Sequence, residues 1–80
     1  MKINVLFFGM LADKAGNKKV SIEIDKPNAT VADVISIVRE KIKTLPEGNF
    51  LLAVNEEQAE PSTSISDKDE VAIMPPFSGG

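Results

Sequence analysis

The pattern of apolar and polar residues predicts four β-strands along the chain. In residues 3–8, Ile3, Val5 and Phe7 fall on one face, because successive side chains of a strand point to opposite sides. Alternation also predicts a strand at residues 19–25, and short apolar segments predict two more strands, at residues 50–54 and 70–74.

The segments between the predicted strands read as connections. A single helical turn is expected at residues 11–15, and residues 55–58 and 67–69 are predicted to be polar turns. Residues 59–65 have only a weak pattern and are given no element.

One segment has the periodicity of an amphipathic α-helix. Its apolar residues recur at the three- and four-residue spacing of one helical stripe, at Val31, Val34, Ile35, Val38 and Ile42. Thr30 is placed to cap this helix, and Asp33 is predicted to complete a capping box and to complement the positive end of the helix dipole. Pro46 and Gly48 are expected to end the helix.

These elements predict a single α+β domain over residues 1–80, with a mixed sheet and one main helix packed on one face. A helix with one apolar stripe and a sheet with one apolar face can bury each other. If the first and last strands are neighbours, Leu6, Phe8 and Met74 form an apolar patch on the other face, which suits a docking surface. A loop of the same chain covering that face is the alternative.

Two absent residue types limit the chemistry of the chain. It has 80 residues and contains neither Cys nor His. Disulfides, thiolate nucleophiles, imidazole bases and cysteine or histidine metal ligands are therefore excluded. We expect no metal site and no independent hydrolytic catalysis, and any sulfur chemistry must use sulfur from another molecule.

Charge and hydropathy argue against two classes of partner. The net charge is -3 and the four aromatic residues are all Phe, whereas nucleic-acid modules present clustered Lys and Arg. No apolar run approaches the ~20 residues that span a bilayer. We expect a cytoplasmic protein that binds neither nucleic acid nor membrane.

The C-terminal segment carries the strongest indication of function. Residues 75–80 read Pro-Pro-Phe-Ser-Gly-Gly. Each proline fixes φ and lacks an N–H, so the chain is expected to leave its sheet at Pro75 as a projecting arm. Glycine has no Cβ, so Gly79 and Gly80 can enter a narrow channel and present the Gly80 carboxylate to a partner enzyme. An ordinary disordered tail has a similar composition and is the alternative.

Four segments resemble the small, sulfur-carrying subunit of molybdopterin synthase, which belongs to the ubiquitin-like β-grasp superfamily. They are residues 3–9, 52–55, 67–71 and 75–80, of which the last and its spacing from residues 69–71 are the most specific. The sequence departs from the family pattern at Lys68, where the Asp-x-Asp turn often carries Gly. If this position needs a positive φ, Lys there costs ~1 kcal/mol.

The resemblance implies a carrier rather than a free-standing catalyst. In this family the terminal glycine carboxylate, here Gly80, is adenylated by an E1-like adenylyltransferase that uses ATP and magnesium, and is then converted to a thiocarboxylate. The tail enters the large catalytic subunit of molybdopterin synthase and gives its sulfur to a pterin precursor of the molybdenum cofactor. The resemblance implies no cofactor bound by the chain itself, and a hetero-tetramer with the large subunit.

The resemblance and the predicted patch together indicate the site residues. Gly80, with Gly79, is expected to carry the chemistry. Contacts to the partner proteins are expected from Phe8, Met74, Pro75, Pro76, Phe77 and Ser78.

Three other functions fit the same sequence. A sulfur carrier for thiamin or tRNA thiolation would use the same Gly79-Gly80 chemistry with different partners. A ubiquitin-like modifier would be joined through Gly80 to a lysine of a target protein. A plain interaction domain would make no use of the tail.

Overall fold

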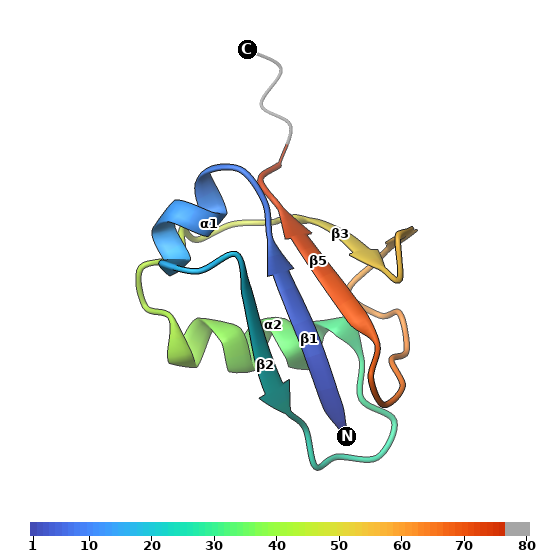
Figure 1. Cartoon of the computed structure of the whole chain (residues 1–80). Helices are drawn as coiled ribbons and strands as arrows, with labels where there is room; N and C mark the ends of the chain where they lie inside the picture. The colour runs from blue at the N-terminus through green and yellow to red at the C-terminus, as the bar shows by residue number, and fades with distance from the viewer. Residues whose placement is uncertain (77–80) are drawn as a thin grey trace.

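The first and last strands of the chain lie side by side at the centre of a five-stranded sheet (Figure 1). The computed structural model describes residues 1–76. The strands, in the order β2-β1-β5-β3-β4, are β1 (Lys2–Phe7), β2 (Lys19–Glu23), β3 (Leu51–Val54), β4 (Glu57–Ala59) and β5 (Glu70–Met74). Strands β1 and β5 are parallel and the other pairs are antiparallel, so the sheet is mixed, as predicted.

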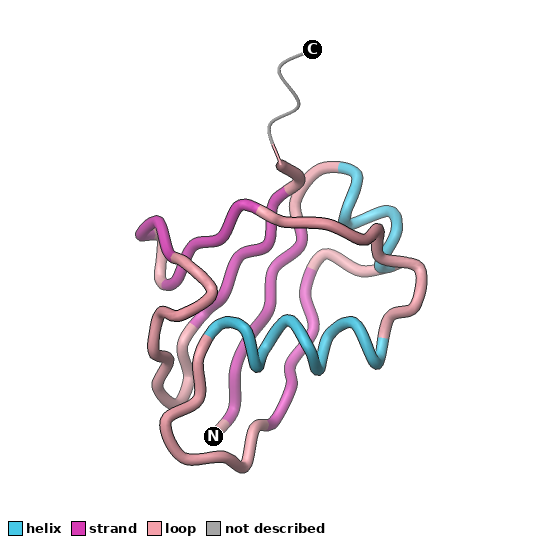
Figure 2. Tube along the Cα trace, turned by 180° about the vertical axis from the view of Figure 1, so that it is seen from behind, coloured by secondary structure: helices cyan, strands magenta, loops and turns pink. Residues whose placement is uncertain are grey.

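Helix α2 (Val31–Lys41) lies across one face of this sheet, and Figure 2 shows it from the helix side. Its buried residues Val31, Val34 and Val38 belong to the predicted stripe. They form one core with the inward-facing residues of the strands, which are Ile3, Val5, Phe7, Ile22, Leu52, Val71 and Ile73. The predicted α+β arrangement, with one main helix on one face, is confirmed.

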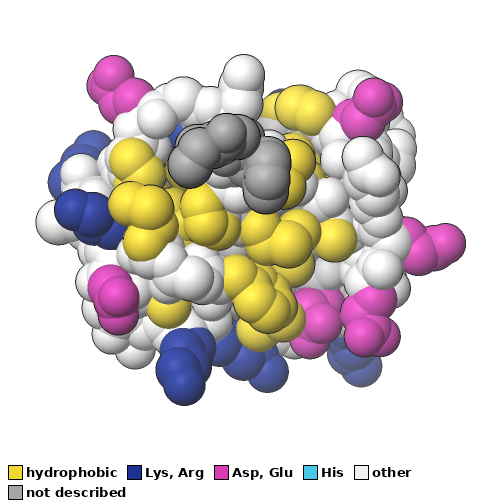
Figure 3. Space-filling view, turned by 90° about the horizontal axis from the view of Figure 1, so that it is seen from above, with side chains coloured by type: hydrophobic (Ala, Val, Ile, Leu, Met, Phe, Trp, Pro, Cys, Tyr) yellow, Lys and Arg dark blue, Asp and Glu magenta, His cyan; other side chains and the backbone are white. Residues whose placement is uncertain are grey.

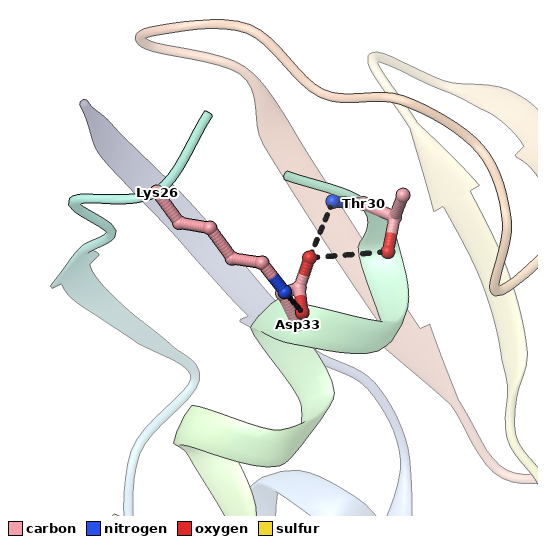
Figure 4. A network of polar contacts seen from close by, with 3 residues as sticks. All are labelled: Lys26, Thr30 and Asp33. Atoms are coloured by element: carbon pink, nitrogen blue, oxygen red, sulfur yellow. Dashed lines mark hydrogen bonds and ion pairs between the residues drawn. The ribbon is translucent and has the colours of Figure 1, made fainter. Parts of the chain in front are cut away.

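Asp33 organises the beginning of α2. Its Oδ2 accepts hydrogen bonds from the Thr30 backbone N–H at 2.8 Å and from the Thr30 hydroxyl at 3.3 Å, while Lys26 Nζ donates to Oδ1 at 2.8 Å (Figure 4). The predicted pairing of Thr30 with Asp33 is therefore confirmed. The hydrogen bond from Lys26, followed by that from the Thr30 backbone, holds the pKa of Asp33 below its usual value of 3.8.

The segment between β4 and β5 also supports this end of the helix. The N–H groups of Val31 and Ala32 donate to the carbonyl oxygens of Thr63 and Pro61, both at 2.9 Å. The first N–H groups of a helix have no partner inside the helix, so this segment satisfies two of them. Ile65, whose N–H donates to Ala29 O at 3.1 Å, adds its buried side chain to the core.

Strand β4 was absent from the predicted elements. It pairs with β3 through a tight turn in which Asn55 and Glu56 have φ values of 50° and 71°. Two central residues at positive φ are typical of a type I′ hairpin turn, which usually contains glycine. The prediction of a turn over residues 55–58 was therefore wrong at its end, because Glu57 and Gln58 already belong to the strand.

The ends of the other elements also correct the prediction. The helical turn expected at residues 11–15 is confirmed as helix α1 (Met10–Ala15), which begins one residue earlier and buries Leu11. Strand β2 ends at Glu23 rather than at residue 25. Helix α2 ends at Lys41, well before Pro46 and Gly48, so these two residues do not stop it. Their carbonyl oxygens instead accept hydrogen bonds from the Arg39 guanidinium, at 2.8 and 2.7 Å.

We expect Asp33→Asn to lower the free energy of unfolding at neutral pH and to reduce the loss of stability as the pH falls. Because the folded-state pKa of Asp33 is lowered, the carboxylate stabilises the fold above the unfolded-state pKa of about 3.9, and this contribution is lost as pH falls through the lower folded-state pKa. Urea unfolding from about pH 7 down to about pH 2 measures this contribution to the free energy of unfolding. Asp25→Asn, at an exposed position, is the control. A difference between wild type and Asp33→Asn that persisted unchanged at the lowest pH would contradict this linkage.

Replacing Lys68 by glycine should stabilise the fold. Lys68 has a φ of 71°, so the turn needs the positive φ on which the expected cost depended. Its N–H donates to Lys2 O at 2.7 Å and its side chain is exposed. Lys68→Gly is expected to raise the free energy of unfolding by about 0.5–1 kcal/mol, because glycine adopts this conformation without strain. Lys68→Ala retains the strain, so denaturant unfolding should show no increase in its free energy of unfolding. An equal increase in both variants would identify the lysine side chain, not φ, as the cause.

Candidate functional site

The parallel pairing of β1 and β5 brings predicted site residues to one edge of the sheet. Phe8 directly follows β1, and its N–H donates to Ile73 O in β5 at 3.2 Å. Met74 ends β5 and leads into Pro75. Phe8 is 48% exposed, Met74 and Pro75 are half-buried, and Pro76 is exposed. The other predicted site residues, Phe77, Ser78, Gly79 and Gly80, lie outside the described residues.

Apolar side chains cover the sheet beside this edge, on the face opposite α2. Leu6, Ala72 and Ala53 lie at one level across β1, β5 and β3, and Met74 pairs with Leu51 at the next level. We call this surface the apolar outer face; it consists of Leu6, Phe8, Leu51, Ala53, Ala72 and Met74. Figure 3 shows hydrophobic side chains gathered at the end of the molecule where β5 stops. The exposure of Phe8 and Leu51 contradicts the alternative in which a loop covers the patch.

Leu51 is a member of the outer face that the sequence did not reveal as a site residue. It is 47% exposed, although it is flanked by the buried Leu52 and the half-buried Phe50. Alternation alone puts Leu51 and Leu52 on opposite sides of the strand. The missing information was that β3 lies next to β5, which places Leu51 beside Met74.

Polar residues surround the apolar outer face. Lys19 in β2 pairs with Leu6, and Gln58 in β4 pairs with Ala53. The row formed by Leu6, Ala72 and Ala53 is therefore flanked by a polar residue on each side. Towards the opposite end of the sheet, Ser21 Oγ donates to Asn4 Oδ1 at 3.0 Å. An apolar centre with a polar rim is the usual anatomy of a protein interface.

Two kinds of feature are absent from residues 1–76: a cluster of metal ligands and a membrane-spanning helix. Within residues 1–76, no group of three or more Asp or Glu side chains is placed to hold a metal ion. No helix in this part of the chain is long and apolar enough to cross a membrane. The feature that the described residues do provide is an exposed apolar face beside the root of the C-terminal segment.

A family match covers nearly the whole chain. The model of the ThiS family aligns with residues 5–80, from within β1 through the two terminal glycines. The chain belongs to the ThiS family. The predicted resemblance to small sulfur carriers of ubiquitin-like fold is therefore confirmed.

Solved structures share the fold of this ThiS-family chain. SAMP1 from Haloferax volcanii is 25% identical over 100% of both chains, with a TM-score of 0.84. A chain in the protein–protein complex of subunits 1 and 2 of molybdopterin-converting factor from Helicobacter pylori is 26% identical over 100% of both chains, with a TM-score of 0.71. A putative molybdopterin converting factor subunit 1 from Pyrococcus furiosus, 23% identical over 96% of this chain and 99% of its own, has a TM-score of 0.84. The fold is the ubiquitin-like β-grasp, as predicted.

Truncation of Phe7 should cost much more stability than truncation of Phe8. Phe7 is 3% exposed and belongs to the core, whereas Phe8 lies on the apolar outer face. We expect Phe7→Ala to lower the free energy of unfolding by about 3–5 kcal/mol. Phe8→Ala should lower it by less than about 1 kcal/mol, because few core contacts are lost. Urea unfolding followed by circular dichroism compares the two; similar losses would place Phe8 in the core and remove it from the outer face.

Proposed function

We propose that this ThiS-family chain is the sulfur-carrying small subunit of a molybdopterin synthase, in which the Gly80 carboxylate is converted to a thiocarboxylate. The observation that carries the proposal is the family match that runs through Gly80. The likeness to a chain of the Helicobacter pylori complex, over the full length of both chains, supports the choice of molybdopterin synthesis among sulfur pathways.

The proposed steps follow from the reactivity of a carboxylate. Joining the Gly80 carboxylate to the AMP moiety of ATP, with release of pyrophosphate, converts a poor electrophile into one with a good leaving group. A hydrosulfide equivalent attacks the carbonyl carbon, AMP departs with the electrons of the C–O bond, and a thiocarboxylate remains. Its sulfur then attacks an electrophilic carbon of the pterin precursor, and an oxygen leaving group departs from that carbon with the bonding electrons and takes up a proton. Water hydrolyses the resulting thioester, which leaves the sulfur on the pterin and restores the Gly80 carboxylate.

The folded domain contributes recognition in this scheme. The apolar outer face docks the large catalytic subunit and, separately, the E1-like adenylyltransferase, which supplies the ATP and magnesium site. Docking holds the tail near its reaction partner and makes the chemical step effectively intramolecular. The proposal includes a hetero-tetramer with the large subunit and a cytoplasmic location.

A second candidate is conjugation to proteins. A second Haloferax volcanii structure, described as small archaeal modifier protein 1, shares the fold. It is 23% identical, with a TM-score of 0.82. The same acyl adenylate could transfer the Gly80 carbonyl to a lysine amine and form an isopeptide bond. The two candidates differ in the product: one adds sulfur to the chain, and the other adds the chain to a protein.

Intact mass spectrometry tests the proposal directly. The protein is incubated with ATP, magnesium, a sulfide source and a matching adenylyltransferase. We expect a gain of ~16 Da at Gly80, the difference between sulfur and oxygen, and transfer of that sulfur to the pterin precursor when the large subunit is added. No gain, with an adenylyltransferase proven active on its own carrier, would overturn the proposal. Conjugates of higher mass that require Gly80 would support the modifier function instead.

Two variants separate the tail from the docking surface in this experiment. Deleting Gly79 and Gly80 should abolish the mass gain while changing the free energy of unfolding by less than about 0.5 kcal/mol. Phe8→Glu should retain the chemistry but raise the KM for the carrier at least about tenfold, because a charge replaces an apolar contact. A KM unchanged by Phe8→Glu would remove the outer face from the docking step.

A further inference from the structure

Gly9 occupies a backbone conformation that other residues avoid. Its φ is 58° and its ψ is -137°, at the sharp turn between β1 and α1. The turn is closed by a hydrogen bond from the Leu11 N–H to Phe8 O at 3.1 Å. These angles are close to those of the first central residue of a type II′ turn, where glycine is favoured because a Cβ would clash with the backbone.

Pro75 lies beside this glycine. A Cβ placed on Gly9 would lie 3.4 Å from Pro75 Cγ and 3.8 Å from Pro75 Cδ, so a methyl group there would already touch the ring. The adjoining hydrogen bond from Phe8 to Ile73 holds the two segments at this separation. A side chain at Gly9 would therefore begin in van der Waals contact with the first residue beyond β5.

Two other described glycines provide an internal comparison. Gly16 and Gly48 also have positive φ values, 77° and 106°, but an added Cβ at either would meet no atom within 4 Å. All three glycines of residues 1–76 have a φ that would strain another residue. Only at Gly9 would the added Cβ also meet the C-terminal segment.

We propose that Gly9 is a positioning residue that sets the direction in which the chain leaves the sheet at Pro75. A side chain at Gly9 strains the turn, and relief of that strain moves the turn against the proline ring. Since each proline fixes its φ, Pro75 and Pro76 transmit such a movement along the chain. This inference rests on the proposed function, in which the Gly80 carbonyl must reach a reaction partner.

In a fully extended segment, a small rotation at the first residue is magnified at the far end. In the extended form that a narrow channel requires, the five residues after Pro75 reach about 16 Å. A rotation of about 10° at Pro75 then moves the far end by roughly 3 Å. Misplacement by about 1 Å can lower the rate of a positioned reaction by up to about a hundredfold.

Kinetics of thiocarboxylate formation distinguish positioning from simple loss of stability. Gly9→Ala is compared with Gly16→Ala and Gly48→Ala, which place a Cβ at other positions of positive φ where no atom lies within 4 Å of it. At matched concentrations of folded protein, we expect Gly9→Ala to lower kcat at least about tenfold while KM changes less than about twofold. Both controls should leave kcat and KM within about twofold of wild type. Equal kcat in all three variants would overturn the proposal.

A measurement independent of the chemistry tests the same point. The chain has no cysteine, so Ser78→Cys carries a single nitroxide label, and paramagnetic broadening of backbone amides reports where the label lies. Gly9→Ala should change the ratio of broadening at Leu6 to that at Ala12, whereas Gly16→Ala should not. An unchanged ratio in Gly9→Ala would refute the positioning role. A changed ratio without any mass gain in the wild-type protein would reject the sulfur-carrier proposal and retain the role of Gly9.

Pro75→Ala covers the case in which Gly9→Ala does not fold. It removes the ring from the contact and leaves the turn at Gly9 unchanged. We expect the same loss of kcat and the same shift in label broadening, at little cost in stability, because Pro75 lies beyond the last strand. Wild-type values for both readouts would show that the contact does not direct the segment.

Discussion

The parallel pairing of β1 with β5 is the constraint on which the rest of the structure depends. It joins Asn4 to Glu70 across almost the whole sequence. The inward-facing side chains of this pair are buried beneath α2; they are Ile3, Val5, Phe7, Val71 and Ile73. Because the C-terminal ends of parallel strands lie side by side, the turn after β1 and the segment after β5 become neighbours. The contact between Gly9 and Pro75 is a direct result of this topology.

The two faces of the central strands serve different purposes. Side chains on the inner face pack against α2 and provide the stability of the domain, at about 25 cal/mol for each Å² of apolar surface buried. The apolar outer face contributes little to that stability, because Phe8 and Leu51 stay about half exposed. Exposed apolar surface of this kind gains its free energy when another protein covers it. Strand alternation thus lets adjacent residues such as Phe7 and Phe8 take separate roles.

The sequence predicted those parts of the structure that leave a pattern in the side chains. The stripe of α2, the pairing of Thr30 with Asp33 and the alternation of β1 are local and were identified correctly. The segment at Pro61 and Thr63 was missed because it acts through backbone carbonyl oxygens, which any residue supplies. Strand β4 was missed because it is short and largely polar. Leu51 needed knowledge of a distant strand pairing, which alternation within one strand does not contain.

The position of β5 in the sequence has a consequence for the synthesis of the protein. When β1, β2 and α2 have left the ribosome, the edge of β1 that will receive β5 is still unpaired, and the core lacks Val71 and Ile73. Contacts between residues so far apart in sequence form slowly, and an open strand edge is prone to association with other chains. Ala72 and Met74 complete the apolar outer face in the same event that completes the core. The whole apolar outer face therefore exists only after β5 has paired with β1 and β3.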